Sequence, residues 1–428
     1  MGDDDLPAIG LDQLRSLQRD RLKATLRQAF DHVLPARARM EAAGVHPDDL
    51  RDLDDLARFP FTVKDDLRAA FPFGMFAVPM EAIVRIHASS GTTGKPTVVG
   101  YTRGDLDTWT GLMARSIRAG GGGPSDIFHN AYGYGLFTGG LGFHYGAERL
   151  GAAVVPSSGG FTERQVRLID DFRPTIVGAT PSYLLTIADA FAAAGLDGKS
   201  SSLRLALCGA EPWSEGLRDE IEARLGLTAL NHYGLSEMMG PGVAQERLDA
   251  RGALTLWEDH FYPEIVDPGT GRVLPDGETG ELVLTPLTRE AMPLVRYRTR
   301  DLTRLLPGEG SALRRIERVK GRSDDMLIIR GVNVFPSQVE AVLAAEPPLA
   351  PYYVLEVTRP HRLDELAVVV EVREGGIGEA ARTALEAEAE HLIKVHVGVS
   401  CAVRVVPPGT VERSEGKAKR VIDRRPRD

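Results

Sequence analysis

The sequence predicts an α/β protein: a large N-terminal domain of mostly parallel sheets with helices, an antiparallel subdomain, and a small α+β C-terminal domain. Short apolar strands alternate with helical segments up to about residue 212, which is typical of a parallel sheet covered by helices. After Trp257 the strands become shorter and Pro-Gly turns separate them, which indicates antiparallel pairing. A last α+β module begins near Gly321, so we place the domains at residues 1–322 and 323–428.

Local patterns predict the elements of the first domain. Leu14, Leu17, Leu22, Leu26 and Phe30 recur at helical spacing and predict a helix from Leu11 to about Ala43. Thr162 and Gln165 predict a capping box at the start of a helix that runs through Phe172. The other predicted helices are 105–119 and 139–150, and the predicted strands are 84–86, 126–129, 152–155, 175–179 and 203–208.

The rest of the chain is predicted in the same way. Turns at Pro268-Gly269 and Pro275-Asp276-Gly277 separate short strands such as 281–285. In the last module a helix begins at Pro336, and we expect Ser337 and Glu340 to cap it. A second helix is predicted at 377–392, and strands are predicted at 326–329, 353–357, 366–372 and 402–406.

Composition limits the classes of function. The 428 residues carry a net charge of −9, which argues against a general nucleic-acid binder, although basic residues gather near the C-terminus. No apolar stretch is long enough to span a bilayer and the first residues are acidic, so we expect a cytoplasmic protein without a membrane partner. Cys208 and Cys401 are too few for a disulfide framework or a zinc cluster, and we expect each to be a small buried hydrophobe.

One loop has the composition of a phosphate-binding site. Its residues are Ser89, Ser90, Gly91, Thr92, Thr93, Gly94 and Lys95. Glycines let backbone N–H groups approach phosphate oxygens, hydroxyls add donors, and the lysine adds positive charge. It is not a Walker A loop, because Ser89 replaces the required glycine and Pro96 replaces the required Ser or Thr. Taken alone, the segment also fits a polar turn between strands.

Four further segments place polar groups where open α/β sheets bind ligands. Gly209-Ala210-Glu211-Pro212 follows a predicted strand, and Tyr233-Gly234-Leu235-Ser236-Glu237 combines an aromatic face with a carboxylate suited to Mg²⁺. Asp301 could accept hydrogen bonds from ribose hydroxyls, and Lys417 follows a glycine near the end of the chain. Each segment alone also fits a surface loop, an ion-pair strip or a solvated tail.

In this order, the segments resemble the adenylate-forming superfamily of acyl-CoA synthetases, luciferases and nonribosomal adenylation domains, and more closely its phenylacetate-CoA ligases. The resemblance covers nearly the whole chain. It is carried by the phosphate loop and by residues 61–68, 71–76, 129–135, 257–264 and 321–338.

The resemblance implies ATP, Mg²⁺ and CoA as ligands. Residues Ser89 to Lys95 would grip the β- and γ-phosphates, and Gly209, Ala210, Glu211 and Pro212 would lie along the adenine. Tyr233 would stack near the base, Gly234 and Ser236 would line the same site, and Glu237 would hold Mg²⁺. Asp301 and Arg322 would bind the ribose. These roles are expectations from the resemblance, residue by residue.

The resemblance also implies a mobile C-terminal domain. Asp324 matches the hinge position, so the small domain would swing between an adenylating pose and a thioester-forming pose. Lys417 would reach the carboxylate and the α-phosphate in the first pose. Gly331 would leave room for a pantetheine arm in the second pose. The resemblance favours a homodimer.

The acid substrate is expected to be an aryl carboxylate. Tyr132, Phe137 and Ala210 match positions that line the aryl pocket of the resembling enzymes and suit a flat ring. Phe143 and His232 stand where those enzymes carry smaller or aliphatic residues. If both face the pocket, a hydroxy- or aminobenzoate fits better than phenylacetate; otherwise both are packing residues. Phenylacetate is the default substrate.

The expected reaction is formation of an aryl-AMP and diphosphate from the acid and ATP, followed by thioester formation with CoA. The alternative is an aryl-AMP ligase that passes a hydroxy- or aminobenzoate to the phosphopantetheine of a carrier protein, or to an amine. A serine hydrolase lacks support because no G-x-S-x-G motif surrounds a serine. A silent nucleotide binder would have lost Lys417 or Glu237, and both are present.

Overall fold

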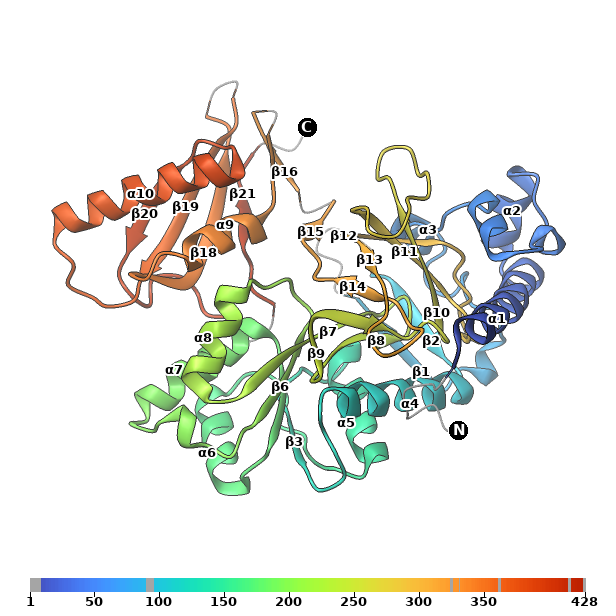
Figure 1. Ribbon diagram of the computed structural model, residues 1–428, viewed down its shortest axis with the longest axis horizontal. Coiled ribbons are helices and arrows are strands. Elements are labelled where there is room, and N and C mark those ends of the chain that lie inside the picture. The colour runs from blue at the N-terminus through green and yellow to red at the C-terminus, as the bar shows by residue number, and fades with distance from the viewer. Residues whose placement is uncertain are drawn as a thin grey trace.

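The computed structural model describes residues 9–89, 96–323, 326–330, 332–360, 363–414 and 417–425 (Figure 1). The α-helices within these ranges are α1 (Leu11–His32), α2 (Leu34–Ala42), α3 (Lys64–Ala69), α4 (Arg103–Ala119), α5 (Thr138–Leu150), α6 (Thr162–Phe172), α7 (Pro181–Ala193), α8 (Glu215–Leu225), α9 (Pro336–Ala344) and α10 (Glu379–Val397). This content confirms the predicted α/β fold class with its large N-terminal part and its smaller C-terminal part.

The largest sheet among the described residues runs in the order β13-β14-β9-β8-β7-β6-β5-β3-β4. Its parallel strands are β3 (Ile127–Asn130), β4 (Ala153–Val155), β5 (Ile176–Ala179), β6 (Leu205–Gly209) and β7 (Thr228–Leu235). Its antiparallel strands are β8 (Gly240–Arg247), β9 (Ala250–Leu256), β13 (Leu305–Leu306) and β14 (Arg315–Glu317). The sheet therefore changes from parallel to antiparallel pairing at β7.

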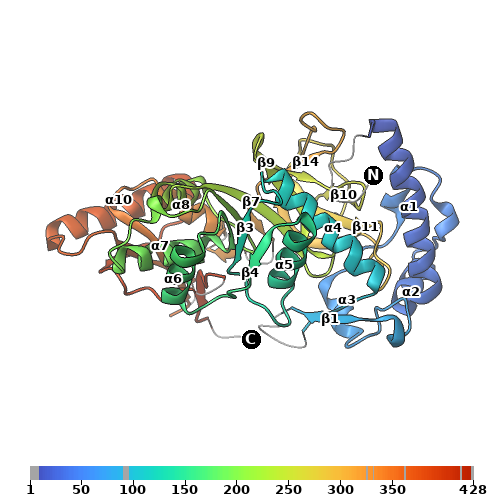
Figure 2. The same cartoon turned by 90° about the horizontal axis from the view of Figure 1, so that it is seen from below.

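Helices cover both faces of the parallel strands because consecutive side chains point to opposite faces. In β6, Leu205 and Leu207 belong to the hydrophobic core that includes α4 and α5, whereas Ala206 and Cys208 belong to the core formed with α6, α7 and α8. Figure 2 shows these two groups of helices on either side of the sheet. Every described residue of β6 is buried, as a strand covered on both faces should be.

The antiparallel subdomain lies next to this sheet. Its sheet has the order β10-β11-β12-β15, formed by β10 (Phe261–Val266), β11 (Gly280–Pro286), β12 (Tyr297–Thr303) and β15 (Gly321–Arg322). A separate hairpin of β1 (Arg85–Ala88) and β2 (Val98–Tyr101) flanks the predicted phosphate loop.

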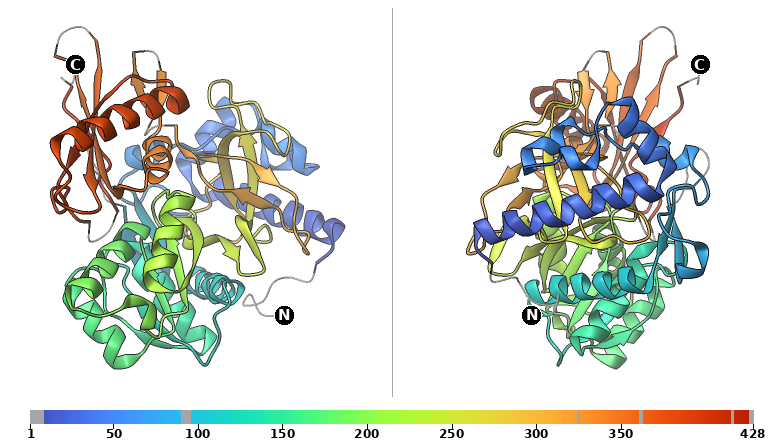
Figure 3. Two further views of the ribbon diagram at one scale, coloured as in Figure 1. Left: turned by 60° about the vertical axis from the view of Figure 1, so that its left-hand side comes forward. Right: turned by 90° about the vertical axis from the view of Figure 1, so that its right-hand side faces the viewer.

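The C-terminal module has a hydrophobic core of its own. Its strands are β16 (Leu327–Ile329), β17 (Val332–Val334), β18 (Leu349–Thr358), β19 (Glu365–Val372), β20 (Ala402–Val406) and β21 (Val421–Asp423). Strand β21 runs parallel to β18, so it ties the segment that follows Lys417 to this module. Figure 3 shows the module beside α8, and α9 packs against α8. The boundary at residues 322 and 323 stays a prediction.

Three local predictions are wrong. The predicted N-terminal helix is two helices, because Val33 between them has extended backbone angles. The capping box of Thr162 and Gln165 does not form: Phe161 precedes α6 in the left-handed conformation, and the buried Gln165 side chain bonds to His129 and to two backbone carbonyls.

The predicted cap of α9 also does not form. Phe335 occupies the N-cap position, so Ser337 and Glu340 lie within the helix. The Ser337 hydroxyl donates to the Lys320 carbonyl, and Glu340 accepts a hydrogen bond from the Ser214 backbone N–H at 2.9 Å. Contacts with the large domain therefore use both side chains that the sequence assigned to local capping.

Candidate active site

The predicted adenine segment begins at the carboxyl end of β6. Gly209, the last residue of β6, pairs with His232 of β7. A Cβ atom on Gly209 would lie only 2.4 Å from the His232 carbonyl oxygen, so the close approach of the two strands requires glycine. Ala210 follows with φ of 72°, an uncommon left-handed conformation for a residue other than glycine. The chain turns sharply here, toward Glu211 and Pro212.

Three residues predicted to bind the nucleoside lie together. The Tyr233 hydroxyl donates to the Asp301 carboxylate at 2.5 Å, and Arg322 lies 3.4 Å from the same carboxylate. The pairing of β12 with β15 places Asp301 opposite Arg322. Burial, followed by the charge of Asp301, raises the pKa of the Tyr233 hydroxyl well above its ordinary value. Tyr233 therefore stays protonated and keeps the Asp301 carboxylate oriented.

The turn that carries Glu237 is fixed from several sides. The Ser236 hydroxyl lies 3.2 Å from that of Thr138 at the start of α5. A Cβ atom on Gly234 would lie 2.2 Å from the Gly240 carbonyl oxygen, so the two ends of the turn need glycine to approach. Glu237 is buried, with a relative exposure of 6%. Burial and the charge of Glu237 raise the pKa of the neighbouring Tyr297 hydroxyl well above its ordinary value.

The predicted phosphate loop stands between β1 and β2 in the sequence. Ser89 and Thr97 close the neck of the loop: the Ser89 N–H donates to the Thr97 carbonyl at 2.9 Å, and the Thr97 N–H donates to the Ser89 hydroxyl at 3.3 Å. Ser90, Gly91, Thr92, Thr93, Gly94 and Lys95 lie outside the described residues, as do Asp324 and Gly331. Their roles stay predictions.

Four of the predicted aryl-pocket residues carry rings, and three of those rings pack together in a cluster. The rings of Tyr132 and Phe143 are nearly parallel with centroids 5.0 Å apart, and the ring of His232 lies 4.9 Å from Phe143. All three side chains are buried. The ring of Phe137, which precedes α5, is instead 52% exposed. Phe143 therefore packs between Tyr132 and His232, and Phe137 lies outside that cluster.

Both ring nitrogens of His232 are used within the protein. Its Nδ1 lies 2.7 Å from the Gln245 side-chain oxygen, and its Nε2 accepts from the Gly242 backbone N–H at 2.8 Å. Because Nε2 accepts, the proton of the neutral ring resides on Nδ1 and is donated to Gln245. Burial lowers the pKa of His232 to about 4. The ring is neutral near pH 7 and offers no free donor or acceptor.

Lys417 lies exposed beside this region. The next residue, Ala418, donates its backbone N–H to the Glu211 carboxylate at 2.8 Å. The same carboxylate accepts from the backbone N–H and the hydroxyl of Ser182. The structure thus brings the predicted adenine turn and the predicted catalytic lysine together, although Lys417 stands 206 positions after Glu211 in the sequence.

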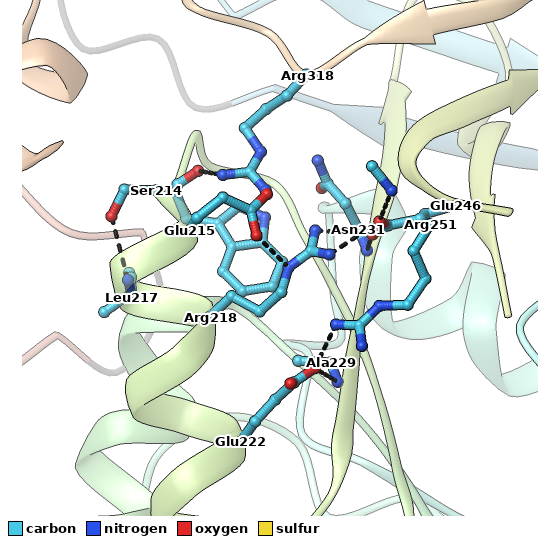
Figure 4. A network of polar contacts seen from close by, with 12 residues as sticks. Ser214, Glu215, Leu217, Arg218, Glu222, Ala229, Asn231, Glu246, Arg251 and Arg318 are labelled. Carbon is cyan, nitrogen blue, oxygen red and sulfur yellow. Dashed lines mark hydrogen bonds and ion pairs between the residues drawn. The ribbon is translucent and has the colours of Figure 1, made fainter.

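A buried polar network supports the far side of the adenine turn (Figure 4). Arg218 of α8 makes a two-pronged ion pair with Glu246 of β8, at 2.9 and 2.8 Å. Glu246 also accepts from the backbone N–H groups of Asn231 and Gly252. Arg318 donates to Glu215 at the start of α8 and to the Trp213 carbonyl. The network joins α8, β7, β8 and the segment that leads to the small domain.

Several residues that contact the predicted site residues were not predicted from the sequence. Ser182, at the start of α7 after β5, had a signal: it stands where a parallel strand gives way to a helix. Tyr297 and Thr138 carry no local signal, because only the tertiary fold brings them to Glu237 and Ser236.

The described residues contain neither a metal-binding cluster nor a membrane-spanning helix. No cluster of three or more His, Cys, Asp or Glu side chains suited to a metal ion occurs there. Within the same part of the chain, no helix has both the length and the apolar character needed to cross a bilayer. The cytoplasmic location and the homodimer stay predictions. Cys208 is buried, as expected, whereas Cys401 is only partly buried.

Comparisons with known proteins agree with this architecture. A family model described as AMP-binding enzyme matches residues 24–286, and one described as AMP-binding enzyme C-terminal domain matches residues 331–425. The chain is 57% identical over 421 residues to the phenylacetate-coenzyme A ligase of Aromatoleum evansii, covering 97% of this chain and 96% of the relative. It is 56% identical to that of Escherichia coli strain K12, covering 99% and 97%.

Solved structures of 2-hydroxyisobutyryl-CoA ligase are also similar. The complex with 2-HIB-AMP in the postadenylation state aligns with a TM-score of 0.90 at 30% identity, covering 98% of this chain and 91% of that one. The complex with 2-HIB-AMP and CoA in the thioesterification state aligns with a TM-score of 0.71 at 31% identity, covering 99% and 91%. The chain therefore belongs to the AMP-binding enzymes and, among them, to the phenylacetate-coenzyme A ligases, which are AMP-forming acid–thiol ligases.

Proposed function

We propose that the protein activates an aryl carboxylic acid, with phenylacetate as the first candidate, and transfers the acyl group to CoA. The observation that carries the proposal is the 55–57% identity, over 97–99% of the chain, to three phenylacetate-coenzyme A ligases. Tyr233 and Arg322 both contact the Asp301 carboxylate, and Glu237 is buried. These contacts support a nucleotide site in this chain.

The reaction has two steps. An oxygen of the acid attacks the α-phosphorus of ATP, and the bond from that phosphorus to the diphosphate breaks. The thiol sulfur of CoA then attacks the carbonyl carbon of the acyl adenylate, the bond to the AMP oxygen breaks, and the thiol proton leaves to solvent. A carboxylate oxygen is a poor leaving group. Forming the adenylate first gives the thiol a carbonyl from which AMP can leave.

The first step joins two anions, so the site must offset their repulsion and stabilise charge that develops on phosphorus. Lys417 and the donors of the Ser89–Lys95 loop would serve this need. Asp301 would accept from the ribose hydroxyls, oriented by Tyr233 and Arg322. The buried Glu237 fits Mg²⁺, which commonly takes one or two carboxylates together with phosphate oxygens. Bound there, Mg²⁺ would neutralise phosphate charge.

The ring cluster supports an apolar aryl acid. Tyr132 stacks on the buried Phe143, so aromatic rings back the predicted pocket, and such surroundings suit a phenyl ring. A hydroxy- or aminobenzoate would need a hydrogen-bonding partner, and both nitrogens of His232 already have partners. A neutral, fully bonded His232 acts as a packing residue beneath Phe143 and gives a substituted ring no advantage.

The placement of the small domain supports an adenylating arrangement. The chain aligns better with 2-hydroxyisobutyryl-CoA ligase in its postadenylation state, at 0.90, than in its thioesterification state, at 0.71. Because the two alignments have nearly the same identity and coverage, the difference reflects how the parts of the chain are arranged. We infer that Lys417 is near its working position here.

An acid and acceptor panel tests the proposal. Purified enzyme with ATP and Mg²⁺ is given phenylacetate, 4-hydroxybenzoate, 4-aminobenzoate or a fatty acid, and diphosphate release and thioester are measured with free CoA and with a phosphopantetheinylated carrier protein. We expect the highest kcat/KM with phenylacetate and free CoA. Preference for a substituted benzoate and a carrier protein would replace the proposal with the alternative aryl-AMP ligase, and activity with the fatty acid alone would refute the aryl assignment.

A further inference from the structure

Glu211 joins three separate parts of the chain through one carboxylate. Its Oε1 accepts from the Ser182 backbone N–H at 2.7 Å and from the Ser182 hydroxyl at 2.5 Å. Its Oε2 accepts from the Ala418 backbone N–H at 2.8 Å. Ser182 belongs to the first turn of α7 in the large domain, and Ala418 directly follows Lys417 in the small domain.

Ser182 and Ala418 both donate hydrogen bonds to the Glu211 carboxylate. An ionised carboxylate has no proton to donate to the adenine ring. A carboxylate can only accept, and its hydrogen bonds to N–H and O–H groups are stronger than those between neutral groups. Burial raises the pKa of the Glu211 carboxyl, while the bonds from Ser182 and Ala418 and the charge of Arg420 oppose that rise. The side chain is therefore committed to the domain contact, although its backbone can still line the adenine.

Other contacts between the two domains lie away from the lysine. Tyr352 donates its hydroxyl to Asp189 of α7 at 2.6 Å, and Arg373 pairs with Glu220 of α8 at 2.7 Å. These contacts hold the small domain against the large one in general. The contact of Glu211, in contrast, reaches Ala418, the residue next to Lys417.

We propose that Glu211 is a positioning residue for Lys417, holding the lysine segment in the site for adenylate formation and releasing it for thioester formation. This inference rests on the proposed two-step function. The bond to Ala418 exists only while the small domain occupies its present position, so it stabilises the adenylating arrangement selectively. Ser182 keeps the carboxylate oriented when the lysine segment is absent, because both of its donors belong to the large domain.

The test is Glu211→Gln, with Tyr352→Phe as the matched control. A glutamine side chain has the same shape, but its NH₂ group must face an N–H donor of either Ser182 or Ala418, so one contact is lost. Tyr352→Phe removes a domain contact of similar length, keeps the ring on which Arg413 packs, and leaves the bond between Ala418 and Glu211 in place. Ser182→Ala is the milder second variant, since it removes the hydroxyl donor and keeps the backbone N–H bond.

Two half-reactions are measured: exchange of labelled diphosphate into ATP with phenylacetate present, and thioester formation from supplied phenylacetyl-AMP and CoA. We expect Glu211→Gln to slow the exchange by about 10- to 100-fold, the range for one lost charge-assisted hydrogen bond. Thioester formation and the KM for ATP should change by less than about threefold. Ser182→Ala should show a smaller loss with the same split, and Tyr352→Phe should affect neither half-reaction by more than about threefold.

Hydrogen–deuterium exchange of peptides that contain Ala418 gives a readout independent of catalysis. The amide of Ala418 should exchange faster in Glu211→Gln than in the wild type, and Tyr352→Phe should leave it protected. The inference would be overturned if both half-reactions lost activity equally or if the effect were confined to the KM for ATP. Unchanged protection of the Ala418 amide would overturn it too. A wild-type enzyme without any acid-dependent exchange would instead refute the proposed function, and the amide measurement would still report on the Glu211 contact.

Discussion

Acidification should destabilise the protein through His232 in a defined pH range. The ordinary histidine pKa is 6.5, and burial lowers that of His232 to about 4. Between these values the unfolded chain binds a proton that the folded protein excludes, so the free energy of unfolding falls as the pH is lowered. Above pH 6.5 the contribution of His232 is fully present, and below about pH 4 no more is lost.

The size of the effect follows from the same two values. The gap from 6.5 to about 4 corresponds to a loss of about 3 kcal/mol, with a slope of at most about 1.4 kcal/mol per pH unit. His129 is also buried, and its pKa is likewise lowered to about 4, so it adds a similar dependence. Comparing the wild type with His232→Leu cancels the His129 contribution and leaves that of His232.

The assay is urea unfolding of both proteins at several pH values between 4 and 7. His232→Leu should be less stable at pH 7, because the Gln245 oxygen and the Gly242 N–H lose their partner at roughly 1–3 kcal/mol each. Its stability should fall less steeply on acidification than that of the wild type. Identical pH dependence of the two proteins would refute the reasoning. Should the variant not fold, an NMR titration of labelled histidines in the wild type decides, and a His232 pKa near 6.5 would be contradictory.

Three further predictions concern the site and its support. Lys417→Ala should slow diphosphate exchange by roughly 100-fold or more and largely spare thioester formation from supplied aryl adenylate; equal loss of both half-reactions would contradict the two-pose account. Glu246→Ala should cost about 3–5 kcal/mol in urea unfolding, because the buried Arg218 loses its two-pronged partner, keeping a 3.4 Å pair with the exposed Glu215, and two backbone N–H groups lose their acceptor. The exposed Asp249, paired with Arg247, is the control, and Asp249→Ala should cost less than about 1 kcal/mol. Gly209→Ala should reduce nucleotide affinity measured by calorimetry, because its Cβ would collide with the His232 carbonyl; unchanged affinity would argue against the required strand approach.

The sequence predicted those features of the fold that depend on local periodicity. Strand β6 reads as a short apolar run, and the two-residue alternation of Leu205 to Cys208 between two cores explains why. The residues that cap the helices were harder to predict from the sequence. Gln165 and Glu340 look like capping residues in sequence, yet each has a partner from a distant segment that outweighs the local contact.

Sequence motifs predicted which residues belong to the candidate site but not which contacts their side chains make. Tyr233, Asp301 and Arg322 stand in recognisable strings, and the structure brings them together. Glu211 was expected at the adenine from its motif, but its carboxylate bonds to Ser182 and Ala418. No local pattern encodes a contact between residues 207 positions apart, because it depends on how the two domains dock.

The central claim is that an acyl adenylate forms before any thiol is involved. The direct measurement is exchange of labelled diphosphate into ATP by the purified enzyme with Mg²⁺ and phenylacetate, in the absence of CoA. We predict exchange that depends on the acid and needs no CoA. Exchange that appears only when CoA is added, or that fails with every aryl acid tested, would contradict it.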